Sequence, residues 1–141
     1  MTSGYSKKSL VQKLGIKENF QIRIFNQPPG YEKTLGELPN YVILSSTNDK
    51  ESLDFIQFFT KESSRLERDF PSLKELLVPN GALWISWPKG SSKIKSDLNE
   101  NMIREIGLKN GLVDVKVCAV DEDWSGLKFV FRVKDRKSEQ K

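Results

Sequence analysis

Residues 81 to 93 read Gly81-Ala82-Leu83-Trp84-Ile85-Ser86-Trp87-Pro88-Lys89-Gly90-Ser91-Ser92-Lys93. The first half of this stretch is apolar, with aromatic and β-branched side chains that favour a strand. The second half contains proline, glycine, serine and lysine, which favour an open loop. The stretch therefore predicts a central strand that runs into a basic loop, and the other elements can be placed around it.

Apolar periodicity predicts strands and helices on both sides of this central strand. Alternating or continuous apolar runs predict further strands, at residues 20–25, 41–46, 54–59, 113–120 and 127–133. Apolar residues at helical spacing predict helices, at residues 6–14, 31–38, 62–77 and 97–110.

Alternation of strands with helices implies an α/β fold, with one mostly parallel sheet that carries helices on both faces. The last two predicted strands form an antiparallel hairpin. We expect a single Rossmann-like domain over residues 1–133. A polar tail at residues 134–141 has no apolar residue to anchor it, and we expect it to be disordered.

Local signals predict where several of these elements begin and end. Gly15, followed by the apolar Ile16, is expected to end the first helix. Asp97 followed by Glu100 matches a capping box for the helix after the basic loop. Residues 78–81, Val-Pro-Asn-Gly, are expected to form a turn after the preceding helix. Pro71 lies inside that helix, where it either kinks the helix or starts a second helical piece.

The composition excludes several kinds of chemistry. The chain of 141 residues has no histidine and a single cysteine, Cys118. Without histidine, Ser-His-Asp and Cys-His activation cannot occur and the commonest zinc ligand is missing, so we predict no metal site. One cysteine, no signal-peptide pattern and no long apolar run indicate a cytoplasmic protein without a membrane span.

The net charge of +4 is modest. Four basic and two acidic residues of the tail account for about half of it, so the rest of the chain is close to balanced. A continuous basic face is therefore not expected, and nucleic acid is disfavoured as a partner.

In parallel sheets, ligands bind at the carboxyl ends of the strands. This rule places four loops at one edge of the predicted sheet, at residues 26–31, 60–62, 86–95 and 121–126. The candidate ligand-binding side chains in these loops are polar, charged or aromatic: Asn26, Tyr31, Ser86, Trp87, Lys89, Lys93, Lys95, Asp121, Trp124 and Ser125.

These side chains allow two interpretations. The lysines and the start of the following helix suit an anionic ligand, whereas the acidic turn at 121–123 could instead neutralise the lysines. Trp84 is expected in the core. Trp87 and Trp124 either cover the end of the sheet or form a stacking wall for a flat ligand.

Several longer motifs resemble a known bacterial family. They are Gly4-Tyr5-Ser6, Leu14-Gly15-Ile16-Lys17, Pro29-Gly30-Tyr31, Gly36-Glu37-Leu38-Pro39, residues 82–89, and residues 113–122 with 124–128. Together they resemble the family catalogued as domain of unknown function 3052, over nearly the whole chain except the tail. This resemblance implies no activity, substrate or catalytic residue.

The order of elements from residue 54 onward is also similar to the second half of a class I S-adenosylmethionine-dependent methyltransferase. That resemblance implies a glycine-rich cofactor loop after the first strand and an acidic residue after the second. Here Gln27-Pro28-Pro29-Gly30 and Ser45-Ser46 stand at those places, and each proline removes a backbone donor.

We therefore expect a module of methyltransferase-like fold that binds a small anionic ligand or a protein partner, with S-adenosylmethionine disfavoured. The alternative is a divergent S-adenosylmethionine-dependent methyltransferase. The sequence leaves open whether the protein is an enzyme and what its oligomeric state is.

Overall fold

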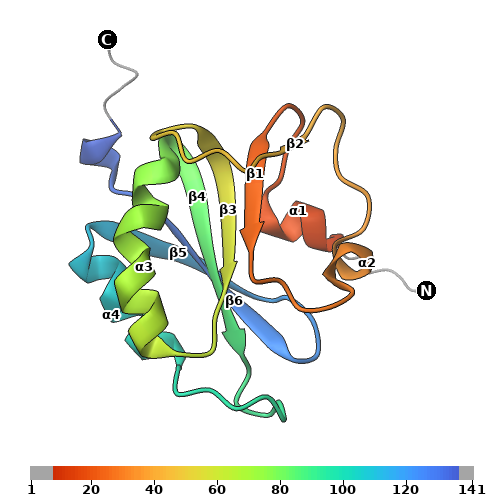
Figure 1. Ribbon diagram of the computed structural model, residues 1–141, viewed down its shortest axis with the longest axis vertical. Helices are drawn as coiled ribbons and strands as arrows, with labels where there is room; N and C mark the ends of the chain where they lie inside the picture. Colours follow the sequence, from red (N-terminus) through yellow and green to blue (C-terminus); the bar gives the residue numbers. More distant parts are fainter. Residues whose placement is uncertain (1–7, 137–141) are drawn as a thin grey trace.

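The computed structural model describes residues 8–136, in which a six-stranded sheet lies between helices on both faces (Figure 1). Helices α3 and α4 pack on one face, and α1 and α2 pack on the other. The predicted α/β class is therefore confirmed. The elements in chain order are α1 (Leu10–Leu14), β1 (Gln21–Phe25), α2 (Tyr31–Leu35), β2 (Ile43–Leu44), β3 (Leu53–Phe59), α3 (Ser63–Leu76), β4 (Leu77–Pro88), α4 (Glu100–Lys109), β5 (Leu112–Ala119), β6 (Trp124–Phe131) and the 3₁₀ helix η1 (Val133–Asp135).

The strands follow the order β2-β1-β3-β4-β6-β5 across the sheet. Strands β1 to β4 pair in parallel, whereas β6 pairs antiparallel with both β4 and β5. The predicted C-terminal hairpin is thus present, with β6 inserted between β4 and β5. The order reverses between β1 and β3, because the chain first steps outward to β2. In open α/β sheets, ligands bind in the crevice outside the strand ends at such a reversal.

Strands β3 and β4 form the buried centre of the sheet. Phe58 belongs to the apolar cluster under α3 and α4, while Phe55 and Phe59 belong to the cluster under α1 and α2. Trp84 is fully buried, as predicted, and its indole N–H donates to the Leu14 carbonyl oxygen at 2.9 Å. This bond ties α1 to the central strand.

Helix α3 runs through Pro71 without a second start. Pro71 has no N–H to donate to the carbonyl oxygen of Glu67, one turn earlier. Both residues are exposed, so water can take that place. Of the two alternatives predicted for Pro71, a kink or a second helical piece, the second is wrong.

The boundaries of two strands also differ from the prediction. The expected turn at 78–81 is part of β4, which pairs with β3 from Leu77 onward and has a register shift near Leu53. Gly81 permits this close pairing, because a Cβ there would lie 3.1 Å from the backbone carbonyl oxygen of Asp54 on β3. At the sheet edge, β2 is only two residues long, and Ile43 and Leu44 are exposed.

The cap of α4 was predicted at the wrong residue. Asn99 is the N-cap, and its side chain accepts the Met102 N–H at 2.9 Å. Asp97 instead lies at the start of α3, where its carboxylate accepts the backbone N–H of Ser63 at 2.8 Å and the Ser63 hydroxyl at 3.2 Å. The first turn of α3 therefore has a carboxylate from a distant loop as its partner.

The two ends of the described chain are short helices. Helix α1 has a capping box between Ser9 and Gln12 and ends at Gly15 with φ of 83°, as the C-cap pattern predicts. It has five residues, fewer than expected. At the other end, ordered structure continues past residue 133 into η1. Residues 137–141 of the predicted tail lie outside the described residues.

Candidate ligand site at the carboxyl ends of the strands

Hydrogen bonds join the four predicted loops into one surface. After β1, the Asn26 side-chain amide donates to the carbonyl oxygen of Phe59 at the end of β3, at 3.2 Å. Two residues further on, the backbone carbonyl oxygen of Lys61 accepts a hydrogen bond from the Ser96 hydroxyl at 2.9 Å. The Ser92 hydroxyl in turn donates to the Asp123 carboxylate at 3.0 Å. The basic loop therefore reaches both the end of β3 and the turn of the hairpin.

A pocket of about 300 Å³ opens at the point where the strand order reverses. We call it the rim pocket. Its lining comes from the ends of β1 and β3, from the start of α3 and from the hairpin: Asn26, Phe59, Thr60, Lys61, Glu62, Arg65 and Trp124.

The rim pocket carries two cations and one carboxylate. Lys61 and Arg65 are exposed, and neither forms an ion pair with any residue between 8 and 136. Glu62 contributes the negative charge. Arg65 was not predicted, because its side chain was expected on the solvent-exposed side of the helix. Its place in the first turn of α3, six residues after the end of β3, was the available signal.

The three lysines of the basic loop do not line the rim pocket. Lys89, Lys93 and Lys95 surround a separate hollow of about 350 Å³ together with Pro88 and Leu98. Both Lys93 and Lys95 are exposed. The structure thus divides the predicted site into two neighbouring hollows.

The acidic turn has a structural role in the hairpin. The Asp121 carboxylate accepts the backbone N–H groups of Asp123, at 2.8 Å, and Trp124, at 2.9 Å. The backbone N–H of Lys89 donates to the Asp123 carbonyl oxygen at 2.8 Å. No lysine of the basic loop forms an ion pair with this turn in the described chain. The contact between the two loops is a set of hydrogen bonds and not a charge neutralisation.

The candidate tryptophans lie on opposite faces of the sheet. Trp87 is 6% exposed and belongs to the cluster under α3 and α4. Trp124 is also 6% exposed, but it lies on the other face, with its ring edge-on to Phe59 at 5.1 Å between centroids. Only Trp124 lines the rim pocket. Ser125, the next residue, pairs with Trp87 across β6 and β4 and is partly buried.

Two other candidate residues belong to a buried polar chain. The Tyr31 hydroxyl donates to the Gln57 side-chain oxygen at 2.6 Å, and the Gln57 amide donates to the Ser86 hydroxyl at 3.0 Å. Gln57 and Ser86 are fully buried. Burial raises the pKa of Tyr31, so its hydroxyl stays protonated as the donor of this chain.

Aromatic rings pack beside this chain of hydrogen bonds. The Tyr31 ring packs edge-on against Phe59, with 4.9 Å between centroids, and Phe59 packs against Trp124 in the same way. Tyr31 and Ser86 are thus buried residues, and their part in ligand binding stays a prediction. The sequence reading missed Gln57, although it is the one polar residue inside the apolar run from Phe55 to Phe59.

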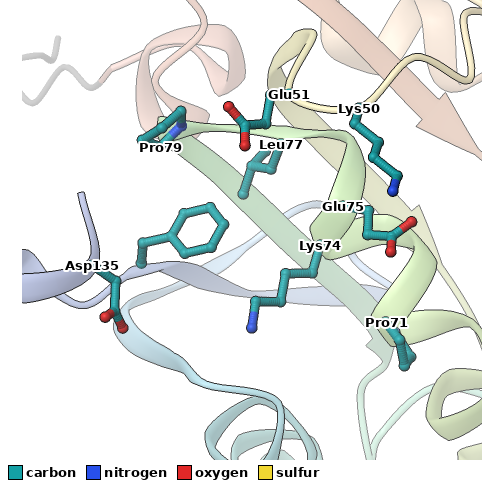
Figure 2. A pocket seen from close by; sticks show the side chains of 9 residues that line it. Lys50, Glu51, Pro71, Lys74, Glu75, Leu77, Pro79 and Asp135 are labelled. Carbon is teal, nitrogen blue, oxygen red and sulfur yellow. The ribbon is translucent and has the colours of Figure 1, made fainter. Parts of the chain in front are cut away.

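Two further pockets lie away from the rim. One of about 480 Å³ lies between β1, α2 and the end of β2, and its lining includes Leu35, Leu44 and Ser45. The other, of about 460 Å³, lies at the amino end of β4, and Figure 2 shows the mixed charges around it. There Lys74 is already engaged, because its ammonium group donates to the Asn110 carbonyl oxygen at 2.6 Å.

Two kinds of function find no support in the described residues. Within residues 8–136 no three cysteine, aspartate or glutamate side chains are grouped so that they could hold a metal ion. No helix in this range is both long and apolar enough to cross a membrane.

Comparison of the sequence with known families and curated proteins finds no match. No family model and no curated protein sequence matches the chain. The resemblance to the family of domain of unknown function 3052 therefore stays a prediction.

Solved structures do match, at low sequence identity. An S-adenosylmethionine-dependent methyltransferase from Aquifex aeolicus superposes with a TM-score of 0.54 and 16% identity, covering 85% of this chain and 86% of that one. Magnesium protoporphyrin IX methyltransferase from Synechocystis, solved with bound SAH, gives 0.53 and 11%, covering 87% and 78%. A 30S ribosomal A1408 methyltransferase from an uncultured bacterium gives 0.50 and 14%, covering 87% and 92%. The chain therefore has the Rossmann-like fold of class I methyltransferases.

Proposed function

We propose that this domain binds a small organic anion in the rim pocket and acts as a binding module of methyltransferase-like fold. The observation that carries the proposal is the presence of two cations, Lys61 and Arg65, that form no ion pair within residues 8–136 and line a pocket at the reversal of the strand order. At this point the sheet itself leaves room for a ligand.

The pocket has the size and chemistry for such a ligand. Its volume of about 300 Å³ is at the lower end of the range for small-molecule sites. Phe59 and the edge of Trp124 supply an apolar wall, while Lys61 and Arg65 supply charge. An arginine and a lysine together favour a carboxylate or a similar group, because arginine donates two parallel hydrogen bonds.

Three features weigh against an S-adenosylmethionine grip in the usual first loop. Pro28 and Pro29 remove two backbone donors. Tyr31, at the end of this loop, is buried and its hydroxyl is bonded to Gln57. The side chains after β2 are Ser45 and Ser46, so no carboxylate stands there for ribose hydroxyls. These features disfavour this cofactor at the first loop, and we assign no methyl-transfer step.

The test is a titration with two probes of different shape, citrate and benzoate, followed by thermal unfolding. Binding at a hundred times Kd stabilises the fold by about 2.7 kcal/mol. We expect at least one probe to stabilise the wild-type chain. The double variant Lys61→Gln/Arg65→Gln should bind at least about tenfold more weakly, since one lost charged contact is worth about 1.4 kcal/mol or more.

The matched control is Arg68→Gln/Lys109→Gln. Arg68 and Lys109 are exposed and pair only with Asp69 and Glu67 in the described chain, and their replacement removes the same total charge. The control should bind like the wild type. Equal weakening in both double variants, or no stabilisation by either probe at millimolar concentration, would show that the rim pocket is not such a site.

A divergent methyltransferase is the second candidate, and the shared fold is the observation that favours it. Calorimetric titration with S-adenosylmethionine and S-adenosylhomocysteine separates the two. Binding that survives Lys61→Gln/Arg65→Gln would favour the methyltransferase, whereas no heat at millimolar ligand would exclude useful affinity for either compound.

A further inference from the structure

Four lysines converge on the outer part of the hairpin, on the face that carries α1. We call them the hairpin lysine cluster: Lys13, Lys17, Lys116 and Lys128. None of them lines the rim pocket or the hollow at the basic loop. The cluster is therefore independent of the function proposed above.

The strands bring two of these lysines directly opposite each other. Lys116 on β5 and Lys128 on β6 are register partners in the antiparallel pair, next to a register shift at Asp114. Side chains at such positions lie on the same face and close together, and like charges there destabilise the sheet. An anion bound between these two ammonium groups would remove this cost.

Among residues 8–136, this cluster has a backbone carbonyl group as acceptor but no carboxylate close enough for an ion pair. The Lys116 ammonium group donates to the Lys13 carbonyl oxygen, near the end of α1, at 3.0 Å. Lys128 lies beside the same helix end, since a Cβ added to Gly15 would be 3.8 Å from its ammonium nitrogen. Within residues 8–136, none of the four ammonium groups has a carboxylate oxygen within 4 Å.

The pKa of Lys128 is consistent with an excess of positive charge around it. Burial, together with the positive charges of Lys116 and Lys17, lowers the pKa of Lys128. The neighbouring Cys118 thiol also feels positive charge from Lys116 and Lys13, although its burial has the larger effect and raises its pKa. The excess positive charge is thus felt on two adjacent strands.

We propose that the hairpin lysine cluster binds a phosphate group, either as a free inorganic anion or as the phosphoryl end of a small ester. A phosphoryl group has three terminal oxygens, inorganic phosphate has a fourth oxygen, and both carry about two negative charges, so either can face several ammonium groups at once. A monovalent ion can relieve only part of the repulsion. Lys13 lies in helix α1 and Lys17 just after it, while Lys116 and Lys128 lie on β5 and β6. The arrangement of these lysines does not involve the residues that line the rim pocket.

The experiment measures thermal unfolding with inorganic phosphate, with glycerol 3-phosphate and with sodium chloride at matched ionic strength. We expect phosphate to raise the Tm of the wild-type chain beyond the effect of chloride, which reports screening alone. An effect of both phosphate compounds indicates that the group itself is recognised. An effect of the ester alone assigns the site to an esterified ligand.

The key variant is Lys128→Met, which keeps a long side chain and removes the charge. Without added anion it should raise the Tm at low ionic strength, because it relieves the repulsion with Lys116. The stabilisation by phosphate should then fall by more than half. Lys128→Arg keeps the charge and should keep the phosphate effect.

Three results would overturn this proposal. One is an equal phosphate effect in the wild type and in Lys128→Met. Another is loss of the phosphate effect in Lys61→Gln/Arg65→Gln with full retention in Lys128→Met, which would assign the anion to the rim pocket. If Lys128→Met unfolds cooperatively but at a lower Tm than the wild type, the lysine is structural and the proposal also fails.

Discussion

Gln57 shows how one polar residue can organise a buried region. It accepts a hydrogen bond from Tyr31 on α2 and donates one to Ser86 on β4, so three elements share its side chain. A buried amide that bridges two hydroxyls restricts each partner to one rotamer. Removing one partner leaves a buried polar atom with no hydrogen-bond partner from the protein or from water.

Replacing Tyr31 by phenylalanine tests this bridge. The ring still packs against Phe59, but the Gln57 oxygen loses its donor, so we expect a loss of about 1–3 kcal/mol in the free energy of unfolding, measured in urea. Tyr41→Phe is the control, because Tyr41 is 78% exposed. A difference between the two variants of less than about 0.5 kcal/mol would contradict the bridge.

The wild type and Tyr31→Phe should also differ in how their stability depends on pH. Because the pKa of Tyr31 is raised in the folded state, the folded chain holds this proton more tightly than the unfolded chain. Its contribution is complete below the unfolded pKa of about 10 and decreases as pH rises above it. Stability of the wild type should therefore fall more steeply than that of Tyr31→Phe above about pH 10.

At the scale of elements, α4 lies unusually close to β6. Gly107 is buried in α4, and a Cβ at this position would overlap the ring of Phe129. Phe129 also packs edge-on against Phe70 of α3, with 5.6 Å between centroids, so it has little freedom to move away. The glycine is thus required by the distance between helix and sheet.

Gly107→Ala should therefore destabilise the fold, although alanine is the better helix former. Overpacking typically costs about 1–3 kcal/mol, which exceeds the helix propensity gain of about 1 kcal/mol. Gly90→Ala is the matched control, since a Cβ at Gly90 meets nothing within 4 Å. A Gly107→Ala variant as stable as Gly90→Ala would mean that α4 can shift on the sheet.

Elements were predictable from the sequence where their signals are local. Trp84 as core, Gly15 as a helix end and the final hairpin all follow from residues next to one another. Asp97 was assigned to the wrong helix because its partner, Ser63, is 34 residues away. The same reason explains Gln57 and Arg65, whose importance depends on neighbours from other strands and loops.

For the whole molecule, stability is expected to be uneven across the sheet. β3 lies between two parallel neighbours and is buried on both faces, whereas β2 is a two-residue edge strand with both side chains exposed. The rule that ligands bind at the carboxyl ends of strands predicted which loops lie together at the rim. It could not predict that Trp87 is buried, because this depends on the face of the sheet toward which its side chain points.

Amide hydrogen exchange should resolve this gradient. The backbone N–H groups of Ile56 and Phe58 in β3 should exchange close to the rate of global unfolding. Those of Ile43 and Ser45, which donate to Phe20 and Ile22 at the edge, should exchange much faster. Equal protection at the two places would show that the edge opens only with the whole domain.

The positions of the three tryptophans make the protein its own optical reporter. All three indoles are at most 6% exposed. The native chain should emit at short wavelength and resist quenching by iodide, and unfolding should reverse both properties. Trp124 is the only indole that touches the rim pocket. With Trp84 and Trp87 replaced by phenylalanine, its emission would follow ligand entry at the rim without any added label.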